Sequence, residues 1–288
     1  MADPALPLDA ALLRARPLPP PRDDVDKNER GRVLAIGGSL RVPGGLALSC
    51  EAALRAGAGK VRAAVPASLA VPLGLAMPEL GILALPEADG EIGAAVALTE
   101  ECGDGDAVLA GPAMNSAEAA QRVVAAVMGA DSAATLIFDA AVLAALTPAL
   151  RERRGAAILT PHVGEMAQML YCSAAEIEAD RERAVRHAAE VFGAVVVLKG
   201  PHTLVAAPDG ALFVYPGGGV GLATSGSGDV QAGIVAGLAA RGASALDAAL
   251  WAVWLHGEAG RRCAAAIGKV GYLARELLPY IPALLDET

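Results

Sequence analysis

Residues 221–240 have the sequence GLATSGSGDVQAGIVAGLAA, and this stretch decides how the rest of the chain can be arranged. Small residues dominate its first half, so the backbone can adopt positive φ angles and its amides can converge on one point. In the second half Val230, Ile234 and Leu238 recur at helical spacing, which predicts a helix that begins near Gly228. A glycine-rich loop leading into the positive end of a helix dipole is suited to hold a phosphate group.

Asp229 falls in the first turn of this predicted helix. There its carboxylate could take a proton from a hydroxyl group that is presented to the same phosphate. A carboxylate in a first turn is also a favourable partner for the helix dipole, so its position alone leaves both interpretations open. No Gly-Lys-Ser/Thr follows the glycines, which distinguishes the loop from the usual P-loop.

The composition limits the class of protein. With 288 residues, 54% of them hydrophobic, the chain can build one large core. Aromatic residues make up only 3%, so we expect thin, closely packed helices and aliphatic strands. A net charge of −9 argues against nucleic acid or an anionic membrane as a partner, and any anion site must therefore be local.

The cysteines and the first residues indicate the compartment. The four cysteines are far apart and form no C-x-x-C pair, so neither a zinc site nor a disulfide framework is predicted. The chain starts without the basic and apolar regions of a signal peptide, and no later segment is suited to span a membrane. We therefore expect a reduced, cytoplasmic protein.

Residues 1–30 are predicted to form an N-terminal arm, because prolines crowd positions 17–21 and only a short helix over 8–16 precedes them. Residues 31–288 are predicted to form a single catalytic domain, since no linker or internal repeat divides them. Within it, the segment around Pro78 is expected to be irregular. Helices are expected over 245–266 and over 272–278, with Pro279 and Pro282 ending the second of these.

Short apolar runs recur along the domain, each followed by a turn and most by a helical segment, and this pattern is typical of buried parallel strands. They span residues 32–36, 60–65, 107–110, 135–138, 156–159 and 195–198. Asp209-Gly210 between two further apolar runs predicts an antiparallel hairpin over 203–215. The fold class is therefore α/β, with a mostly parallel central sheet.

Ligands of such sheets collect beyond the carboxyl ends of the strands. This rule brings residues 37–39, Gly111, Asp139, His162 and Lys199 to one crevice. Lys199 could bind phosphate or ribose oxygens, or simply extend from a strand end into solvent. His162 could contact a substrate or cap a helix.

Two carboxylates in this crevice could hold Mg²⁺ through water. They are Asp139 and Glu165, although each taken singly is better explained as a solvated carboxylate at a helix start. His256, between Leu255 and Gly257 on a predicted helix, is expected to be partly buried and satisfied by hydrogen bonds, while His187 and His202 are expected in loops or on the surface.

Four motifs in this order resemble the ADP-dependent (S)-NAD(P)H-hydrate dehydratases, which are members of the ribokinase-like fold. They are TPHVGE at 160–165, VLKGPHT at 197–203, LATSGSGDVQAG at 222–233 and LHGEAG at 255–260. The resemblance extends over about residues 30–285 and implies a three-layer α/β/α architecture with helices on both faces of the sheet.

The resemblance also implies a chemistry. Such enzymes transfer a phosphoryl group from ADP, or from ATP in some relatives, to the ring hydroxyl of a hydrated nicotinamide cofactor, and loss of phosphate restores NAD(P)H. Mg²⁺ accompanies the nucleotide without a direct protein ligand. The implied partners are the hydrate and an adenine nucleotide, with neither nucleic acid nor membrane, and the implied assembly is a homotetramer.

The roles carry over by matching motif. Asp229 would be the catalytic base. The adenine nucleotide would be bound by Lys199, Gly200, Pro201, His202, Thr203, Ser225, Gly226, Ser227 and Gly228. The hydrate would be bound by Gly45, Asn115, His162 and Asp229.

The chain departs from the family pattern at several places, three of which concern the loops of the predicted site. The sequence TSGSGD at 224–229 stands where TGGTGD is usual, GPAMN at 111–115 stands where GPGLG is usual, and Gly45 replaces a usual Ala. The changed substrate loop leaves two alternatives open. One is a kinase of the same fold acting on a vitamin-like alcohol, and the other is a nucleotide-binding relative without catalysis.

Overall fold

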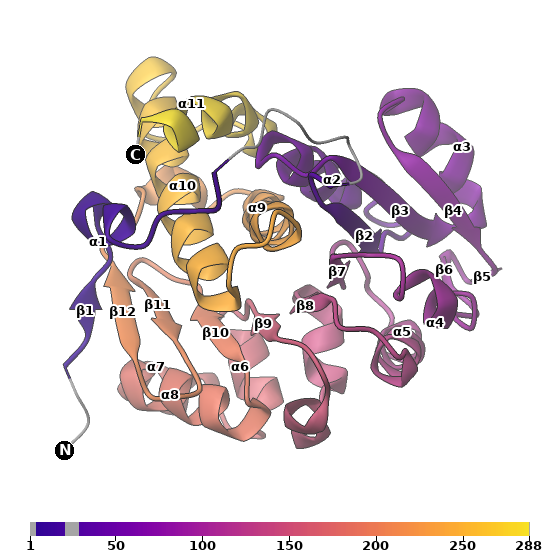
Figure 1. Ribbon diagram of the computed structural model, residues 1–288, viewed down its shortest axis with the longest axis horizontal. Helices are drawn as coiled ribbons and strands as arrows, with labels where there is room; N and C mark the ends of the chain where they lie inside the picture. The colour runs from indigo at the N-terminus through magenta and orange to yellow at the C-terminus, as the bar shows by residue number, and fades with distance from the viewer. Residues whose placement is uncertain (1–3, 21–28, 288) are drawn as a thin grey trace.

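A ten-stranded sheet forms the centre of the protein in a computed structural model that describes residues 4–20 and 29–287 (Figure 1). The strand order is β1-β12-β11-β10-β9-β8-β7-β2-β3-β4. Every neighbouring pair is parallel except the two pairs that contain β11. The predicted, mostly parallel α/β sheet is therefore confirmed, as is the antiparallel hairpin at its end.

The six predicted parallel strands are present with nearly the predicted bounds. Strands β7, β9 and β10 are wholly buried, and β8 is buried except for Thr135. In chain order the strands of the main sheet are β1 (Leu6–Pro7), β2 (Arg32–Ile36), β3 (Lys60–Pro66), β4 (Gly81–Leu85), β7 (Ala107–Ala110), β8 (Thr135–Phe138), β9 (Ala157–Leu159), β10 (Val195–Leu198), β11 (Thr203–Ala206) and β12 (Leu212–Tyr215). A separate small hairpin consists of β5 (Glu87–Ala88) and β6 (Glu91–Ile92).

Helices cover both faces of the sheet, as Figure 1 shows. One face carries α2 (Gly45–Arg55), α9 (Ser227–Ala240), α10 (Ala245–Ala266) and α11 (Ile281–Asp286). The other carries α5 (Ala117–Gly129), α6 (Val163–Met169), α7 (Ala174–Ala179) and α8 (Arg181–Phe192). Successive strand residues alternate between the two hydrophobic clusters, Ile137 packing with the first group of helices and Phe138 with the second. The three-layer α/β/α prediction is confirmed.

The described part of the N-terminal segment is joined to the body. β1 pairs with β12 at the edge of the sheet, and α1 (Ala10–Arg14), which is shorter than the predicted helix, buries Leu8 and Leu13 against the domain. Trp251 of α10 donates a hydrogen bond to the carbonyl of Arg16 at 2.8 Å. Residues 21–28 of the predicted arm lie outside the described residues, and the division into arm and domain stays a prediction.

The prediction of an irregular segment between β3 and β7 holds at residues 77–80, a turn that contains Pro78, and was wrong for most of the segment. Residues 66–106 contain α3 (Ala67–Ala76), the parallel strand β4, the β5–β6 hairpin and α4 (Leu98–Glu101). Pro72 lies inside α3, and this helix is apolar on its buried and exposed sides alike, so the sequence shows neither a helical period nor an uninterrupted helix.

The predicted helix over 272–278 was also wrong. Short 3-10 turns occupy Ala274–Glu276 and Leu278–Tyr280, and α11 then begins at Ile281. Pro279 and Pro282 fall in the first turns of these elements, where a missing amide hydrogen costs nothing, so they start helical turns and do not end one.

Helices α9 and α2 pack unusually close because two glycines face the partner backbone. A methyl group on Gly233 would lie 2.2 Å from the carbonyl oxygen of Ser49, and one on Gly237 would lie 2.5 Å from that of Ala53. Ser49 also donates a hydrogen bond to the carbonyl of Asp229 at 2.9 Å. This contact fixes the first turn of α9 against the first half of α2.

Gly233→Ala should therefore lower the free energy of unfolding by roughly 1–3 kcal/mol, because the added methyl group meets backbone that cannot move aside. Urea unfolding followed by circular dichroism measures the effect. Gly129→Ala in α5 is the matched control, since a methyl group there meets no atom within 4 Å. We expect this control to be neutral or slightly stabilising. Equal effects of the two substitutions would contradict the close α9–α2 contact.

Candidate active site

The glycine-rich loop ends in a left-handed residue, and α9 starts directly after it. Gly226 has φ 84° and precedes the first helical residue, Ser227, whose amide donates to the carbonyl of Thr224 at 3.2 Å. The next amides, those of Gly228 and Asp229, lie in the first turn, where a helix provides no carbonyl partner four residues earlier. The loop therefore presents amide donors and the positive end of the dipole at one point, as the sequence predicted.

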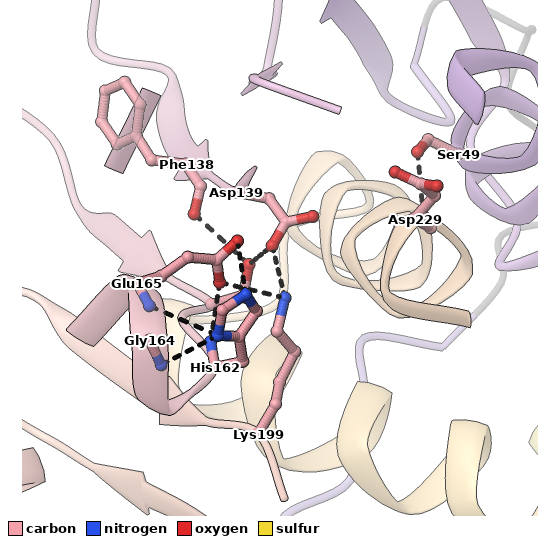
Figure 2. A network of polar contacts seen from close by, with 9 residues as sticks. Ser49, Phe138, Asp139, His162, Gly164, Glu165, Lys199 and Asp229 are labelled. Atoms are coloured by element: carbon pink, nitrogen blue, oxygen red, sulfur yellow. Dashed lines mark hydrogen bonds and ion pairs between the residues drawn. The ribbon is translucent and has the colours of Figure 1, made fainter. Parts of the chain in front are cut away.

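Lys199, at the end of β10, lies beside this first turn. A Cβ atom on Gly228 would be 3.4 Å from its Nζ. The same Nζ donates to Oδ1 of Asp139 at 2.7 Å and lies 3.8 Å from Oε2 of Glu165 (Figure 2). Asp139 in turn accepts a hydrogen bond from the Thr160 hydroxyl at 2.7 Å. Strand ends far apart in sequence thus bring one ammonium group to the start of α9.

The cluster contains three carboxylates and one lysine, and burial together with the neighbouring charges shifts the pKa values of Asp229, Glu165 and Lys199. Burial raises the pKa of Asp229 to about 7. The negative charges of Asp139 and Glu165 add to this effect, and the positive charge of Lys199 opposes it. Burial likewise raises the pKa of Glu165. Burial alone would lower the pKa of Lys199, but Asp139 and Glu165 outweigh it, so this pKa is raised.

This arrangement suits base catalysis next to a phosphate. A carboxyl group with a pKa near neutral pH can both accept a proton and release it again. The amides at the start of α9 and the Lys199 ammonium can stabilise the charge of a transferring phosphoryl group. The geometry therefore favours Asp229 as a base over a simple partner of the helix dipole.

A pocket of about 850 Å³ opens beside the cluster. Of the residues predicted to bind nucleotide, it is lined by Lys199, Gly200, Pro201, His202, Thr203, Ser227 and Gly228. Ser225 and Gly226 are not among its lining residues, because they form the turn behind α9. The pocket is enclosed on its other side by residues 215–220 and by α10.

His162 has the capping role that the sequence left as an alternative. Its Nδ1 accepts from the amide of Gly164 at 2.9 Å, while Glu165 accepts from the amide of His162 at 2.7 Å, and together these bonds form a capping box for α6. His162 also lines the 850 Å³ pocket, together with most of the residues predicted to bind the nucleotide.

The other predicted hydrate-binding residues lie on the opposite side of Asp229. A methyl group on Gly45 would be 3.4 Å from Oδ2 of Asp229 and 2.6 Å from Cβ of Ala113. Asn115, two residues further along this loop, donates to the hydroxyl of Ser39 at 2.7 Å. Gly45 and the 111–115 loop therefore meet next to the carboxylate.

Sequence reasoning missed two polar side chains around the crevice. Glu91 is 7% exposed, accepts from the amide of Asn115 at 2.9 Å, and has an Oε2 atom that is buried without a hydrogen-bond partner. Gln231 lines the pocket, and its Oε1 is likewise buried without a partner. Gln231 follows Asp229 by two residues, which was a usable signal, whereas Glu91 lies in the segment expected to be irregular.

His256 is buried as expected, and its partner lies in the phosphate loop. Its Nε2 is 2.9 Å from the Ser227 hydroxyl, and burial lowers its pKa to about 4. A neutral imidazole at this place can orient the Ser227 hydroxyl toward the pocket without adding charge.

The carboxylates do not form a metal cage. Asp139 and Glu165 already bind Lys199, Thr160 and the amide of His162. Within residues 4–20 and 29–287 no group of three or more His, Cys, Asp or Glu side chains is placed to hold a metal ion. Two carboxylates at the side of a phosphate site do fit a Mg²⁺ ion that is carried by the nucleotide and reached through water.

None of the described helices is long and apolar enough to cross a bilayer.

Comparison with known proteins identifies relatives over nearly the whole chain. A family described as NAD(P)H-hydrate dehydratase matches residues 33–283. The ADP-dependent (S)-NAD(P)H-hydrate dehydratase of Xanthomonas campestris is 48% identical over 283 residues, which cover 96% of this chain and 95% of that protein. Other curated relatives are bifunctional NAD(P)H-hydrate repair enzymes, and the chain spans about half of their length.

Solved structures of related proteins have the same fold as this chain. The ADP/ATP-dependent NAD(P)H-hydrate dehydratase of Bacillus subtilis, co-crystallised with ATP and Mg²⁺, superposes with a TM-score of 0.86 at 29% identity, covering 98% of both chains. A ribokinase-like superfamily protein from Enterococcus faecalis superposes with a TM-score of 0.77 at 24% identity, covering 94% of this chain and 92% of that one, and it supports the fold alone.

The raised pKa of Asp229 predicts a pH-dependent gain in stability for Asp229→Asn. Between the pKa of a free aspartate, about 4, and the folded pKa of about 7, the folded state holds a proton that the unfolded state has lost. Stability of the wild type therefore falls as pH rises through this window, while the amide has no such cost. Melting temperatures at pH 5, 6, 7 and 8 should show an advantage of the variant that grows up to about pH 7 and then stays constant.

Asp9→Asn controls for the loss of a carboxylate, because asparagine can still cap α1. An advantage of Asp229→Asn that is the same at every pH would contradict the raised pKa.

Proposed function

This chain belongs to the NAD(P)H-hydrate dehydratase family, and from that premise we propose that it restores (S)-NAD(P)H hydrate to NAD(P)H at the expense of ADP. It is thus a lyase that repairs a damaged nicotinamide cofactor. The observation that carries the proposal is the half-buried carboxylate of Asp229, held between the Lys199 cluster and Gly45 at the start of a phosphate-binding helix.

The reaction has two steps in this site. Asp229 takes the proton of the ring hydroxyl while the oxygen of that hydroxyl attacks the terminal phosphorus of ADP, so that an O–P bond forms and the bond to AMP breaks. The phosphorylated hydrate then loses phosphate and a ring proton, which leaves the double bond of the dihydronicotinamide. The balance is one hydrate and one ADP converted to NAD(P)H, AMP and phosphate.

The residues of the chain divide between the two substrates. We assign the adenine nucleotide to the 850 Å³ pocket, with Lys199 and the amides of Gly228 and Asp229 on its phosphates. The hydrate then lies on the Gly45 and Asn115 side. Mg²⁺ would arrive with the nucleotide and neutralise phosphate charge, with Asp139 and Glu165 near enough to contact its water shell. The Xanthomonas relative is named for ADP and the Bacillus relative for ADP and ATP, and we propose ADP as the donor here.

The reaction yields reduced nicotinamide cofactor, and we place it in the cytoplasm. All four cysteines are free in the structure, which suits a reducing compartment.

Asp229→Asn should lower the rate of NAD(P)H formation by at least about a thousandfold, because the amide cannot accept the hydroxyl proton. The rate is followed by the return of the absorbance of the reduced nicotinamide. Binding of ADP, measured by calorimetry, should stay within about threefold of the wild type. Wild-type enzyme should release one AMP for each NAD(P)H formed. Turnover by Asp229→Asn would refute the assigned base, and a stable phosphorylated product without NAD(P)H would favour a kinase of the same fold.

We also propose that the protein is a homo-oligomer, a tetramer, that uses the α3 and β4 edge. Val71 and Leu75, one helical turn apart on α3, are 69% and 80% exposed, and β4 ends the described sheet without a further partner strand. A second copy can cover both features across a two-fold axis.

Leu75→Glu should then lower the mass measured by light scattering, because a carboxylate cannot be buried in an apolar contact. Tyr171→Glu, at a side chain that is 89% exposed on the other side of the sheet, is the control and should leave the mass unchanged. A wild-type monomer would contradict the proposal.

A further inference from the structure

Ala113 has a backbone conformation that alanine rarely adopts. Its φ is 60°, in the left-handed region, and it is one of four non-glycine residues with positive φ in the described part of the chain. Asparagine and aspartate can compensate for this conformation with local hydrogen bonds, but alanine cannot. Strained residues of this kind persist where the surroundings determine the conformation, and they cluster at functional sites.

The surroundings do determine the conformation of this loop. The amide of Gly38 donates to the carbonyl of Pro112 at 2.9 Å, and the amide of Met114 donates to that of Gly111 at 3.2 Å. On the far side of Ala113, Asn115 is held by Glu91 and Ser39. Ala113 is therefore fixed between two anchored neighbours.

Its methyl group and the carboxylate of Asp229 both border the space in front of Gly45. A side chain on Gly45 would begin 2.6 Å from Cβ of Ala113, closer than two carbon atoms can approach, and 3.4 Å from Oδ2 of Asp229. Only one of these two positions can carry a methyl group. The two departures from the family pattern at 45 and 113 are therefore a single exchange, in which the methyl group sits on the loop and not on α2.

We propose that Ala113 is a positioning residue for the hydrate, whose methyl group forms the wall beside Asp229 and fixes the face from which the ring hydroxyl reaches the carboxylate. Gly45 leaves the space for this wall, so the two residues act as one coupled pair. The inference rests on the proposed role of Asp229 and extends it to how the substrate is oriented.

We expect this wall to limit the access of water to Asp229, whose pKa is raised chiefly by burial. The charged groups that face Asp229 are Lys199 from β10, Asp139 from the end of β8 and Glu165 from α6. Among the described residues no hydrogen bond or ion pair joins these three groups to Ala113. We therefore expect removal of the methyl group to change the hydration of Asp229 and to leave its charged neighbours in place.

Three variants test the pair in the full-length protein. Ala113→Gly should melt at or above the wild-type temperature, since glycine tolerates φ 60°. We nevertheless expect KM for the hydrate to rise at least fivefold, and the acid limb of the kcat/KM profile to move to lower pH as water reaches Asp229. Gly45→Ala should lose at least tenfold in kcat/KM and melt lower. The double variant Gly45→Ala with Ala113→Gly should recover most of the kcat/KM and most of the melting temperature that Gly45→Ala loses.

Tyr171→Gly is the control for relief of backbone strain, because Tyr171 has φ 53° and its side chain is 89% exposed. It should leave the kinetics unchanged. The inference is overturned if Ala113→Gly keeps the wild-type KM and pH profile. It is also overturned if the fold-loss in kcat/KM of the double variant equals the product of the fold-losses of the two single variants. A wild-type protein that restores no reduced cofactor from hydrate overturns the proposed function instead, and the two failures are thereby distinguished.

Discussion

The contact between α9 and α2 is the constraint on which the site depends. Gly233 and Gly237 let the two helices approach backbone to backbone, and this approach sets where the first turn of α9 ends up relative to Gly45. A phosphate loop alone could point in many directions. Fixed against α2, it brings Asp229 beside the 111–115 loop on one side and beside Lys199 on the other.

The charge balance of the cluster explains why one carboxylate differs from the others. Lys199 is closest to Asp139, and that pair also has the Thr160 hydroxyl, so its charges are largely compensated within the protein. Asp229 is influenced by the same ammonium but is buried without a direct bond to it in the described network, and its pKa rises to about 7. Similar side chains in one crevice thus acquire different chemical roles through burial and distance.

Several buried polar groups around the crevice are incompletely satisfied in the protein alone. Gln231 and Glu91 each have a carbonyl or carboxylate oxygen without a protein partner, and Ala113 holds a strained backbone. In an ordinary core such unsatisfied groups and strained backbone would lower stability without serving a function. Here they lie where nucleotide and hydrate would bind, which agrees with a site whose stability is partly given up for function.

Local patterns in the sequence determined the strands, the hairpin, the start of α9 and the residue types of the proposed base and the proposed phosphate loop, because turn chemistry and hydrophobic period act between near neighbours. Residues 66–106 and 272–286 were predicted incorrectly, since Pro72, Pro279 and Pro282 look like breakers until their exact helical positions are known. Only the tertiary structure decided that Glu91 supports Asn115 and that His162 caps α6 while facing the nucleotide pocket. It also decided that Gly45 and Ala113 share one space, because this depends on the packing of segments 68 residues apart, which no local pattern encodes.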